Sequence, residues 1–341
     1  MKLIDLAESG HAPDWIVRLG IRRLLTRRLA QEFDRDPMRR AQRSQALIAE
    51  LAESAVAIET DAANEQHYEV PAAFYQLALG RRLKYSSGYW PEGVNDLDAA
   101  EDAMLEATCQ HAELEDGQRI LELGCGWGSL TLWMAENYPE SRITAVSNSA
   151  SQREHIMAQA ENRGLANIEV LTRDVNTLAL NERFDRVVSV EMFEHVRNYR
   201  ELMKRISGWL RPNGKLFVHI FCHRYLLYPF ETQGEGNWMG RYFFTGGLMP
   251  AADTLLHFQD DLAIESRRLY SGRNYARTAR GWLDNMDHRK TEVAEVMREA
   301  YGDQASVWQQ RWRMFFMACE ELFAFDDGNV WLVAHYRFSR R

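Results

Sequence analysis

The middle of the chain alternates between short apolar runs and longer segments with helical periodicity. The apolar runs predict strands, and they fall at residues 119–124, 142–147, 168–171, 184–190 and 214–221. Helical spacing of apolar residues occurs between them, at residues 129–138, 151–164 and 198–210. Strands that alternate with helices in this way predict an α/β fold with a doubly wound, mostly parallel sheet.

The two flanks of this region follow other patterns. Residues 1–65 have helical periodicity and no strand signal. Beyond the alternating region, the glycine-rich aromatic stretch 234–250 predicts a loop, and strands are predicted at 261–271 and 330–338 with helices between them. We therefore expect an N-terminal helical region (1–65), a ligand-binding α/β core (66–225), and a lid or insertion with the C-terminal strands that complete the core sheet (226–341).

Composition narrows the class of protein. With 341 residues, 46% hydrophobic, 26% charged and a net charge of −8, the chain resembles a soluble globular protein and not a basic nucleic-acid binder. No apolar run reaches the roughly 18 residues of a membrane span, and the first residues lack the apolar segment of a signal peptide. The four cysteines lie far apart, which argues against disulfides or a zinc site and favours the cytoplasm.

The N-terminal helical region carries five arginines within residues 15–31. One interpretation is a helix that lies on an anionic membrane surface and delivers the protein to phospholipid. The other is a basic face that packs on the α/β core, in a monomer or in a homodimer.

The most informative motif is ILELGCGWGSL, residues 120–130. A predicted strand ends before Gly124, glycines follow at alternate positions, and a helix begins near Ser129. Glycine lets the backbone turn tightly and approach a ligand closely. With Glu122, the loop has the ExGxGxG pattern of S-adenosylmethionine methyltransferases, in which an acid can offset the positive charge of the ligand. The alternatives are a dinucleotide site or a glycine turn without a ligand.

Two further strand ends fit the same ligand. Nucleotide-binding folds often place an acid against the ribose hydroxyls after the second strand, whereas here Ser147 and Asn148 would serve through neutral hydrogen bonds. After the third strand, Asp174 stands where a carboxylate can accept from an adenine amino group. The alternative for Asp174 is a plain helix or turn cap.

Titratable residues gather after the fourth predicted strand. Glu191, Glu194 and His195 fall within five residues, directly after FDRVVSV. If the chain turns helical there, Glu191 and His195 share one face and Phe193 points into packing. Such folds bind ligands at the carboxyl ends of their strands, so these residues are candidate catalytic groups. The alternative is a solvated helix start, where the helix dipole favours acids.

Several motifs together resemble a known family. They are YSSGYW, ILELGCGWGSL, SNSASQ, VSVEMFEHVRNY and GGLMP, which are similar to motifs of the cyclopropane-fatty-acid synthase superfamily of methyltransferases. Nearly the whole chain resembles the coclaurine N-methyltransferase branch of that superfamily. The resemblance implies a class I methyltransferase fold, which is Rossmann-like: a seven-stranded, mostly parallel sheet with an N-terminal helical cap and a helical insertion before the last strands.

The resemblance also implies roles for single residues. Glu191 and His195 match the catalytic pair of the coclaurine branch, and Glu194 would support them. Glu69 matches a substrate-binding Glu of related N-methyltransferases, and a surface acid is the alternative. Eight positions would bind S-adenosylmethionine, whose product is S-adenosylhomocysteine: Tyr85, Ser86, Gly124, Gly126, Ser147, Asn148, Gln152 and Asp174.

Cyclopropane synthases of this superfamily use a bicarbonate ion as a base, and the resemblance assigns five positions to it. The glutamate of the FEH motif, His219 and Tyr275 match, whereas Ser87 replaces a cysteine and Phe221 replaces an isoleucine. Glu191 stands where those enzymes carry a glycine, so a new carboxylate enters the pocket. These differences argue against a bicarbonate base.

The remaining candidates are side chains that could line a substrate pocket. His219 and His223 would face one side of a strand, where core or pocket-lining positions are favoured over metal ligands, so we expect no metal. Trp238, Tyr242 and Phe243 could cage an organic cation with their ring faces, or pack as an ordinary lid. The predicted substrate-binding residues are Glu69, His219, Trp238 and Tyr275.

These observations favour an S-adenosylmethionine-dependent methyltransferase that acts on a small amine. An amine is protonated near neutral pH, so carboxylates could hold the ammonium and a histidine could take its proton. The second hypothesis is methylation or cyclopropanation of an unsaturated acyl chain on phospholipid, in which a base removes a proton from a carbocation. Glu191 with Ser87 favours the amine, and the basic helix favours the lipid. A ligand-sensing protein that kept the fold is the non-enzyme alternative.

Overall fold

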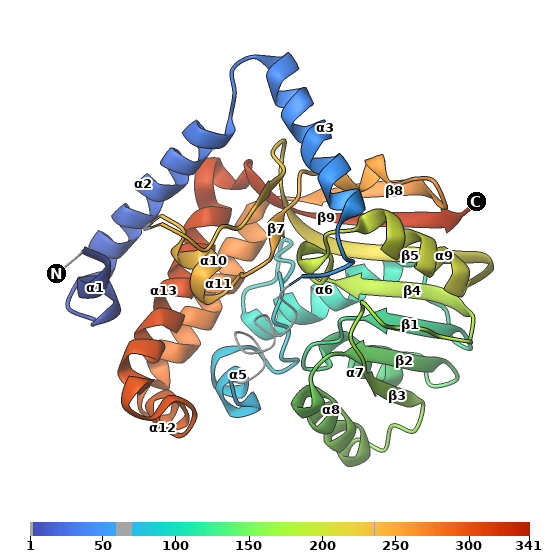
Figure 1. The fold of residues 1–341 in the computed structure, drawn as a ribbon. Coiled ribbons are helices and arrows are strands. Elements are labelled where there is room, and N and C mark those ends of the chain that lie inside the picture. The colour runs from blue at the N-terminus through green and yellow to red at the C-terminus, as the bar shows by residue number, and fades with distance from the viewer. Residues whose placement is uncertain (1–2, 59–69, 235) are drawn as a thin grey trace.

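Seven strands form one sheet at the centre of the molecule. The computed structural model describes residues 3–58, 70–234 and 236–341. The strands are β1 (Arg119–Leu123), β2 (Arg142–Ser147), β3 (Ile168–Thr172), β4 (Phe184–Val190), β5 (Leu210–His223), β8 (Leu262–Tyr270) and β9 (Trp331–Arg340). Their order is β3-β2-β1-β4-β5-β9-β8; β9 pairs antiparallel with both β5 and β8, and the other pairs are parallel (Figure 1). The predicted seven-stranded, mostly parallel sheet is confirmed.

Helices cover both faces of the parallel strands. They are α6 (Leu97–His111), α7 (Ser129–Asn137), α8 (Ala150–Asn162) and α9 (Tyr199–Trp209). Successive side chains of a strand point to opposite faces, so Ile120 packs with α6 and α7 while Leu121 packs with α9. Val188 and Val187 of β4 divide between the same two clusters. Burial on both faces explains the continuous apolar runs of these strands.

A helical insertion lies between β8 and β9. It consists of α11 (Gly272–His288), α12 (Lys290–Tyr301) and α13 (Ala305–Ala324), with the 3-10 turns η3 (Gly302–Gln304) and η4 (Phe325–Gly328). Aromatic side chains join it to α5 (Ala72–Ala78), where the rings of Phe74 and Trp312 lie 4.7 Å apart. Figure 1 shows these helices beside the end of the sheet at which the parallel strands finish. The insertion therefore stands over the edge where such sheets bind ligands.

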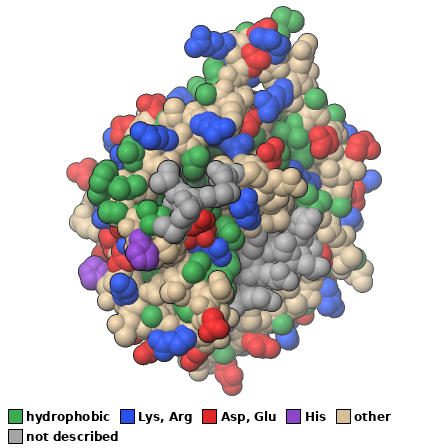
Figure 2. All heavy atoms as spheres, turned by 60° about the vertical axis from the view of Figure 1, so that its left-hand side comes forward, with side chains coloured by type: hydrophobic (Ala, Val, Ile, Leu, Met, Phe, Trp, Pro, Cys, Tyr) green, Lys and Arg blue, Asp and Glu red, His purple; other side chains and the backbone are tan. Residues whose placement is uncertain are grey.

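The N-terminal helices pack on the insertion and on α9. They are α1 (Leu3–Glu8), α2 (Asp14–Glu32) and α3 (Pro37–Glu53), so the helical prediction is confirmed over the described part of residues 1–65. Arg18 and Arg22 of α2 form ion pairs with Glu321 of α13. Figure 2 shows further Lys and Arg side chains near the top of the molecule, where α2 meets α3 in Figure 1. Within the described ranges, no helix is both long and apolar enough to cross a membrane.

The prediction of a loop without regular structure at residues 234–250 is wrong. This stretch contains α10 (Trp238–Tyr242) and β7 (Leu248–Met249), and β7 pairs with β6 (Tyr228–Pro229); the turn η2 (Thr254–His257) follows. Tertiary packing orders the segment, because the ring of Phe243 stacks on Phe315 of α13 with centroids 4.3 Å apart. The strands predicted at 261–271 and 330–338 are confirmed as β8 and β9.

Candidate active site

The glycine loop joins β1 to α7 in backbone conformations that favour glycine. Gly124, Gly126 and Gly128 have φ values of 80°, 51° and 83°. A side chain at Gly124 would lie 2.7 Å from Met192, and one at Gly128 would lie 2.6 Å from Ile156 of α8. A side chain at Gly126 would meet nothing within 4 Å, and Gly126 lines a cavity. The loop therefore packs tightly against the protein and leaves space on the cavity side.

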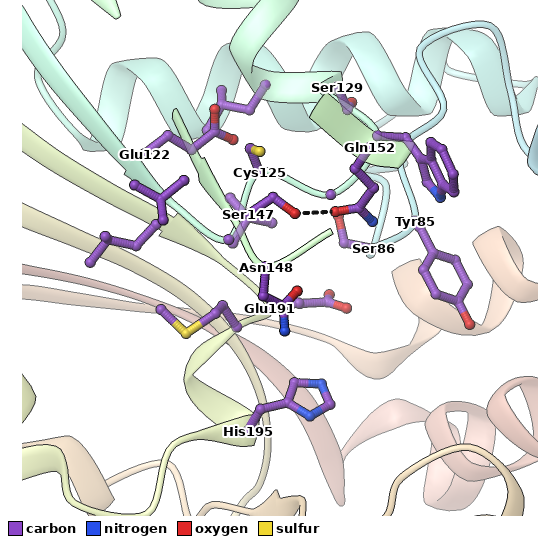
Figure 3. Close-up of a pocket in the computed structure, with 18 of the residues that line it drawn as sticks. Tyr85, Ser86, Glu122, Cys125, Ser129, Ser147, Asn148, Gln152, Glu191 and His195 are labelled. Carbon is purple, nitrogen blue, oxygen red and sulfur yellow. Dashed lines mark hydrogen bonds between the residues drawn. The ribbon is translucent and has the colours of Figure 1, made fainter. Parts of the chain in front are cut away.

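One cavity at the carboxyl edge of the sheet brings most of the predicted site together. Glu191, His195 and Tyr275 line it. Figure 3 shows Glu191 between the glycine-loop residues and His195. All the residues predicted to bind the cofactor line the same cavity: Tyr85, Ser86, Glu122, Gly124, Gly126, Ser147, Asn148, Gln152 and Asp174.

Strand ends and helix starts build the cofactor side of the cavity. The Ser147 hydroxyl, at the end of β2, donates to the side-chain oxygen of Gln152 over 2.7 Å (Figure 3). Ser149 caps α8. Asp174, after β3, accepts from the backbone N–H of Asn176 over 2.7 Å. Because Asp174 both caps a turn and lines the cavity, the two interpretations of this residue are compatible.

Glu122 lines the cavity although it is almost fully buried. Its Oε2 accepts from the Thr131 hydroxyl over 2.5 Å, and burial raises the pKa of Glu122 to about 8. The buried hydroxyl of Ser129, on the same cavity wall, has no partner among the described residues. A cationic ligand would favour the ionised form of Glu122, and the Ser129 hydroxyl offers a further hydrogen bond. The residues present therefore fit S-adenosylmethionine.

Glu191 follows β4 in a backbone conformation that favours glycine. Its φ is 47°, and its N–H donates to the carbonyl of His219 over 2.8 Å. The carboxylate is held at three points: Oε1 accepts from the Ser87 N–H (3.0 Å) and lies 3.1 Å from His219 Nε2, and Oε2 accepts from the Tyr275 hydroxyl (2.5 Å). Strained, well-held residues of this kind concentrate at functional sites.

The charge of Glu191 is set by burial and by a buried lysine. Burial raises the pKa of Glu191, while the Lys84 ammonium, the Tyr275 hydroxyl and the Ser87 N–H oppose that rise. Burial also lowers the pKa of Lys84 to about 8. The Lys84 ammonium donates to the Ser86 hydroxyl and, over 2.9 Å, to the carbonyl of Ser87. A buried cation and a buried carboxylate therefore share one wall of the cavity.

His195 belongs to the 3-10 turn η1 (Phe193–His195) and not to the α-helix that its spacing from Glu191 suggested. The left-handed backbone of Glu191 prevents a helical path there. His195 nevertheless lines the cavity, and its ring stacks on Phe244 with centroids 4.8 Å apart. Burial lowers the pKa of His195 to about 4, and the charge of Glu191 opposes this shift. The imidazole is therefore neutral near neutral pH.

Glu194 lies behind the cavity and is not among the described residues that line it. It is fully buried, and its Oε1 accepts from the Phe221 N–H of β5 over 2.7 Å. Burial raises the pKa of Glu194 well above its usual value, and the charge of Glu191 raises it further, which favours the neutral acid. Phe193 is fully buried, as predicted.

The structure does not bring Trp238 to the cavity. Its indole N–H donates to Glu8 of α1 over 2.7 Å, and its ring packs on Phe243 with centroids 5.3 Å apart. The ring of Tyr242 faces the guanidinium of Arg311 at 4.0 Å. Trp238 therefore packs between α1, α10 and α13, in agreement with the alternative of ordinary lid packing, and its contact with substrate stays a prediction.

The predicted histidines of β5 have separate positions. His219 contacts Glu191 from outside the cavity lining, and Nδ1 of His223 accepts from the backbone N–H groups of Tyr225 and Leu226, over 2.9 Å each. In the part of the chain that the structure describes, no group of three or more His, Cys, Asp or Glu side chains could hold a metal ion. Glu69 lies outside the described residues.

Sequence reasoning missed Lys84 and the aromatic wall of the cavity. Lys84 directly precedes YSSGYW, but nothing in the neighbouring residues distinguishes it from a solvated lysine. Phe244, Trp282 and Phe315 line the cavity from segments of the C-terminal region. Their spacing is typical of any apolar core, so the sequence carried no signal of a binding wall.

Comparisons with known proteins identify relatives along the whole chain. The family model described as Mycolic acid cyclopropane synthetase matches residues 57–333. The (S)-coclaurine N-methyltransferase of Thalictrum flavum subsp. glaucum is 34% identical, over 100% of this chain and 96% of that protein. The cyclopropane-fatty-acyl-phospholipid synthase of Escherichia coli (strain K12) is 29% identical, over 81% of this chain and 67% of that protein.

A solved structure is similar over nearly the whole length. The crystal structure of coclaurine N-methyltransferase bound to N-methylheliamine and SAH has a TM-score of 0.96 and 34% identity, and the match covers 99% of both chains. The predicted class I methyltransferase fold is confirmed, with its helical cap and insertion. The chain therefore belongs to the mycolic acid cyclopropane synthetase family, and it is an S-adenosylmethionine-dependent methyltransferase.

Proposed function

We propose that this methyltransferase transfers a methyl group to the nitrogen of a small amine. The observation that carries the proposal is the Glu191 carboxylate, which lines the cavity and is oriented by Ser87, His219 and Tyr275. A carboxylate attracts an ammonium and can then take its proton. An amine acceptor needs both, because its lone pair must be free before it can attack a methyl group.

S-adenosylmethionine, when bound, supplies a methyl group on a sulfonium, which a nucleophile displaces in line. Glu122 would offset the positive charge of the ligand, while Ser147, Asn148 and Asp174 would form hydrogen bonds to its nucleoside. Gly126 leaves room for the ligand on the cavity side of the loop. The other members of the binding site are Tyr85, Ser86, Gly124 and Gln152.

Glu191 and His195 would handle the proton of the amine. Burial raises the pKa of Glu191 and so strengthens it as a base, while the ionised form still attracts the ammonium. His195 is neutral near neutral pH and offers a second acceptor on the cavity wall. Glu194 would support the pair by holding η1 against β5 through its bond to Phe221.

The Glu191 side chain would also replace the bicarbonate ion of cyclopropane synthases. Ser87, His219 and Tyr275 stand at three of the five positions that the family resemblance assigns to that ion, and here they hydrogen-bond Glu191 instead. A second anion at this point would be repelled by the buried carboxylate. We infer that the enzyme carries its base as part of the chain.

The cavity walls support an aromatic amine as the acceptor. Phe221, Phe244, Trp282 and Phe315 line the cavity, and aromatic faces attract organic cations. The relative of known structure was crystallised with N-methylheliamine, which is consistent with the same class. Substrate contact by Glu69 and Tyr275 remains a prediction. His219 would act on the substrate through its bond to Glu191.

The N-terminal helix supports a proposal about partners. Trp15, Ile16 and Leu19 of α2 have exposed fractions of 68%, 41% and 43%, while Arg18 and Arg22 are engaged with α13. We infer that this apolar face meets a second copy of the chain in a homodimer, with an anionic membrane surface as the alternative. Sedimentation with and without anionic vesicles separates the two.

The four free cysteines support a cytoplasmic location.

Methyl-labelled S-adenosylmethionine tests the acceptor class. The enzyme is incubated with a panel of secondary amines, aromatic ones included, and with vesicles of unsaturated phospholipid. Mass spectrometry then locates the label after saponification. Label in the amines is the expected result. Label in acyl chains would overturn the proposal in favour of lipid methylation, and binding of S-adenosylmethionine without any transfer would favour a ligand-sensing protein.

A further inference from the structure

Three histidines form a continuous hydrogen-bonded chain that begins at Glu191. Nε2 of His219 lies 3.1 Å from Oε1 of Glu191, and Nδ1 of His219 lies 2.9 Å from Nε2 of His335. Nδ1 of His335 lies 2.9 Å from Nδ1 of His111, which is also 3.4 Å from the Tyr270 hydroxyl. Both ring nitrogens of His219 and of His335 are therefore engaged in the chain.

The histidine chain leads from the cavity wall to the protein surface. His219 and His335 are direct partners across β5 and β9, and His111 is the last residue of α6. His219 is 0% exposed and His335 is 2% exposed, whereas His111 is partly exposed. The three rings lie outside the set of described residues that line the cavity. Among the described residues, the bond between His219 and Glu191 joins the three rings to the cavity wall.

Building on the amine methylation proposed above, we propose that His219, His335 and His111 form a proton relay that carries the proton of the amine from Glu191 to solvent. The geometry points to this role because each internal ring presents one nitrogen to the group before it and the other nitrogen to the group after it. Imidazole can accept a proton at one nitrogen while it donates from the other.

The transfer balances atom by atom. An N–H bond of the ammonium breaks and an O–H bond forms on Glu191, which leaves the lone pair on the amine nitrogen. The Glu191 proton passes to Nε2 of His219 as the Nδ1 proton of His219 passes to Nε2 of His335. The Nδ1 proton of His335 then passes to Nδ1 of His111, whose Nε2 proton goes to water. The transfer starts with the protons on Nδ1 of His219, Nδ1 of His335 and Nε2 of His111, and it leaves the His219 proton on Nε2, from which it donates to the ionised Glu191. Each ring must regain its starting tautomer before the next turnover.

The relay matters because Glu191 is needed twice as an anion. It takes a proton before methyl transfer, and the amine nitrogen becomes cationic again as the new N–C bond forms. An ionised Glu191 stabilises that developing charge, whereas a protonated Glu191 does not. With the amine and the cofactor both in the cavity, the direct route from Glu191 to water is blocked, and the histidines provide another exit.

The groups around the relay keep its histidines neutral, so that a proton moves along the chain and is not retained on one ring. Burial lowers the pKa of His219 and of His335, and Lys84 lowers both further. Burial also lowers the pKa of His111 to about 4. The cationic groups acting on the chain are Lys84, Arg268 and Arg337. The rings are therefore neutral near neutral pH, and the surface end releases a proton to water.

His335→Gln is the first test, because glutamine keeps hydrogen-bonding groups at this position but does not conduct protons as imidazole does. Single-turnover methyl transfer is measured against pH with a strongly basic secondary amine. Below the pKa of the amine, the variant should lose about tenfold or more in rate. Above that pKa the two profiles should converge, because the amine then arrives without its proton. The wild type and the variant should methylate a weakly basic amine at rates within about twofold of each other.

His223→Gln is the matched control, because His223 is another buried histidine of β5 that lies outside the relay. It should leave the shape of the pH profile unchanged. His111→Gln, at the partly exposed end, should reproduce the pH-dependent loss, and it keeps the test available if the His335 variant does not fold. An equal loss at every pH, or no loss at any pH, would overturn the relay.

A second measurement does not depend on turnover. In enzyme labelled with nitrogen-15 histidine, Glu191→Gln should shift the ring nitrogen resonances of His111. In a background that already carries His335→Phe, adding Glu191→Gln should cause no such shift. No shift at His111 would contradict the relay. If the wild-type enzyme methylates no amine, the proposed function fails, and the resonance experiment still decides whether Glu191 and His111 are coupled.

Discussion

The hydroxyl of Tyr275 donates to Oε2 of Glu191 over 2.5 Å. Tyr275 comes from α11 of the helical insertion, whereas Glu191 follows the central strand β4. The ring of Tyr275 is fixed in turn by stacking on Phe323, with centroids 4.2 Å apart. The insertion therefore does more than cover the sheet, because one of its side chains orients the candidate base and lowers its pKa.

Tyr275→Phe should shift the acid limb of the activity profile to higher pH. The hydrogen bond from Tyr275 lowers the pKa of Glu191, so its loss raises that pKa and reduces the ionised fraction at any pH below it. Turnover should fall by roughly tenfold near neutral pH, the effect of one hydrogen bond to a charged group, and recover at alkaline pH. The measurement is kcat/KM against pH, and an unmoved acid limb would separate Tyr275 from the ionisation of Glu191.

Glu191→Gln should keep cofactor binding and lower turnover by roughly 10²-fold or more, the scale of general acid–base catalysis. Glutamine preserves the size of the side chain but cannot take a proton from the amine. Calorimetric titration with SAH and steady-state rates are measured on the same preparation. Glu191→Asp is the companion variant, since it keeps the charge but shortens the reach to Ser87 and Tyr275. Unchanged turnover in Glu191→Gln would remove this residue from the mechanism.

Turnover should not depend on bicarbonate. The groups of Ser87, His219 and Tyr275 that could hold such an ion already hold the Glu191 carboxylate. Rates are measured in degassed buffer under inert gas, and again with added bicarbonate. Equal rates are expected. Glu191→Gly, which restores the glycine of cyclopropane synthases, provides the contrast: recovery of its turnover by bicarbonate would show that the ion can occupy the vacated place.

Much of the fold was predictable because local patterns and burial agree. The run at 184–190 coincides with β4, since its neighbouring apolar residues Val187 and Val188 are buried on opposite faces of the sheet. The stretch 234–250 was not predictable, because its order depends on Phe243 packing against Phe315 of a helix far along the chain. The glycine-rich sequence predicts turns, but it does not indicate the surface against which the segment packs.

The candidate site was predictable where function imposes a local pattern. The glycine loop requires positive φ at Gly124, Gly126 and Gly128, and that requirement is visible as a motif. The backbone conformation after β4 was not predictable from the sequence. The positive φ at Glu191 arises from tertiary constraints that its spacing to His195 does not reveal. Lys84, His335 and His111 meet only in the folded chain, so residue spacing could not connect them.

Gly128→Ala should destabilise the protein by about 1–3 kcal/mol, because a Cβ there meets Ile156 at 2.6 Å and must adopt a φ of 83°. Gly126→Ala is the matched variant, with open space around its Cβ but a place on the cavity wall. It should weaken SAH binding more than it lowers stability. Urea unfolding of the free protein and SAH titrations compare the two. Equal effects of both variants on stability would contradict this assignment of the loop.

The affinity for S-adenosylmethionine should rise with pH until about pH 8. Burial raises the pKa of Glu122 to about 8 in the cavity without ligand, so the acid is mostly protonated near neutral pH. A cationic ligand favours the ionised form, so binding expels a proton and the affinity gains up to about tenfold per pH unit below that pKa. The α-amino group of the ligand titrates near the same pH, at about 8, so Glu122→Gln is the necessary control. The difference between the two profiles isolates Glu122. Calorimetry in buffers of different ionisation enthalpy should show proton release for the wild type and less for the variant, whereas equal release would mean that Glu122 does not respond to the charge of the ligand.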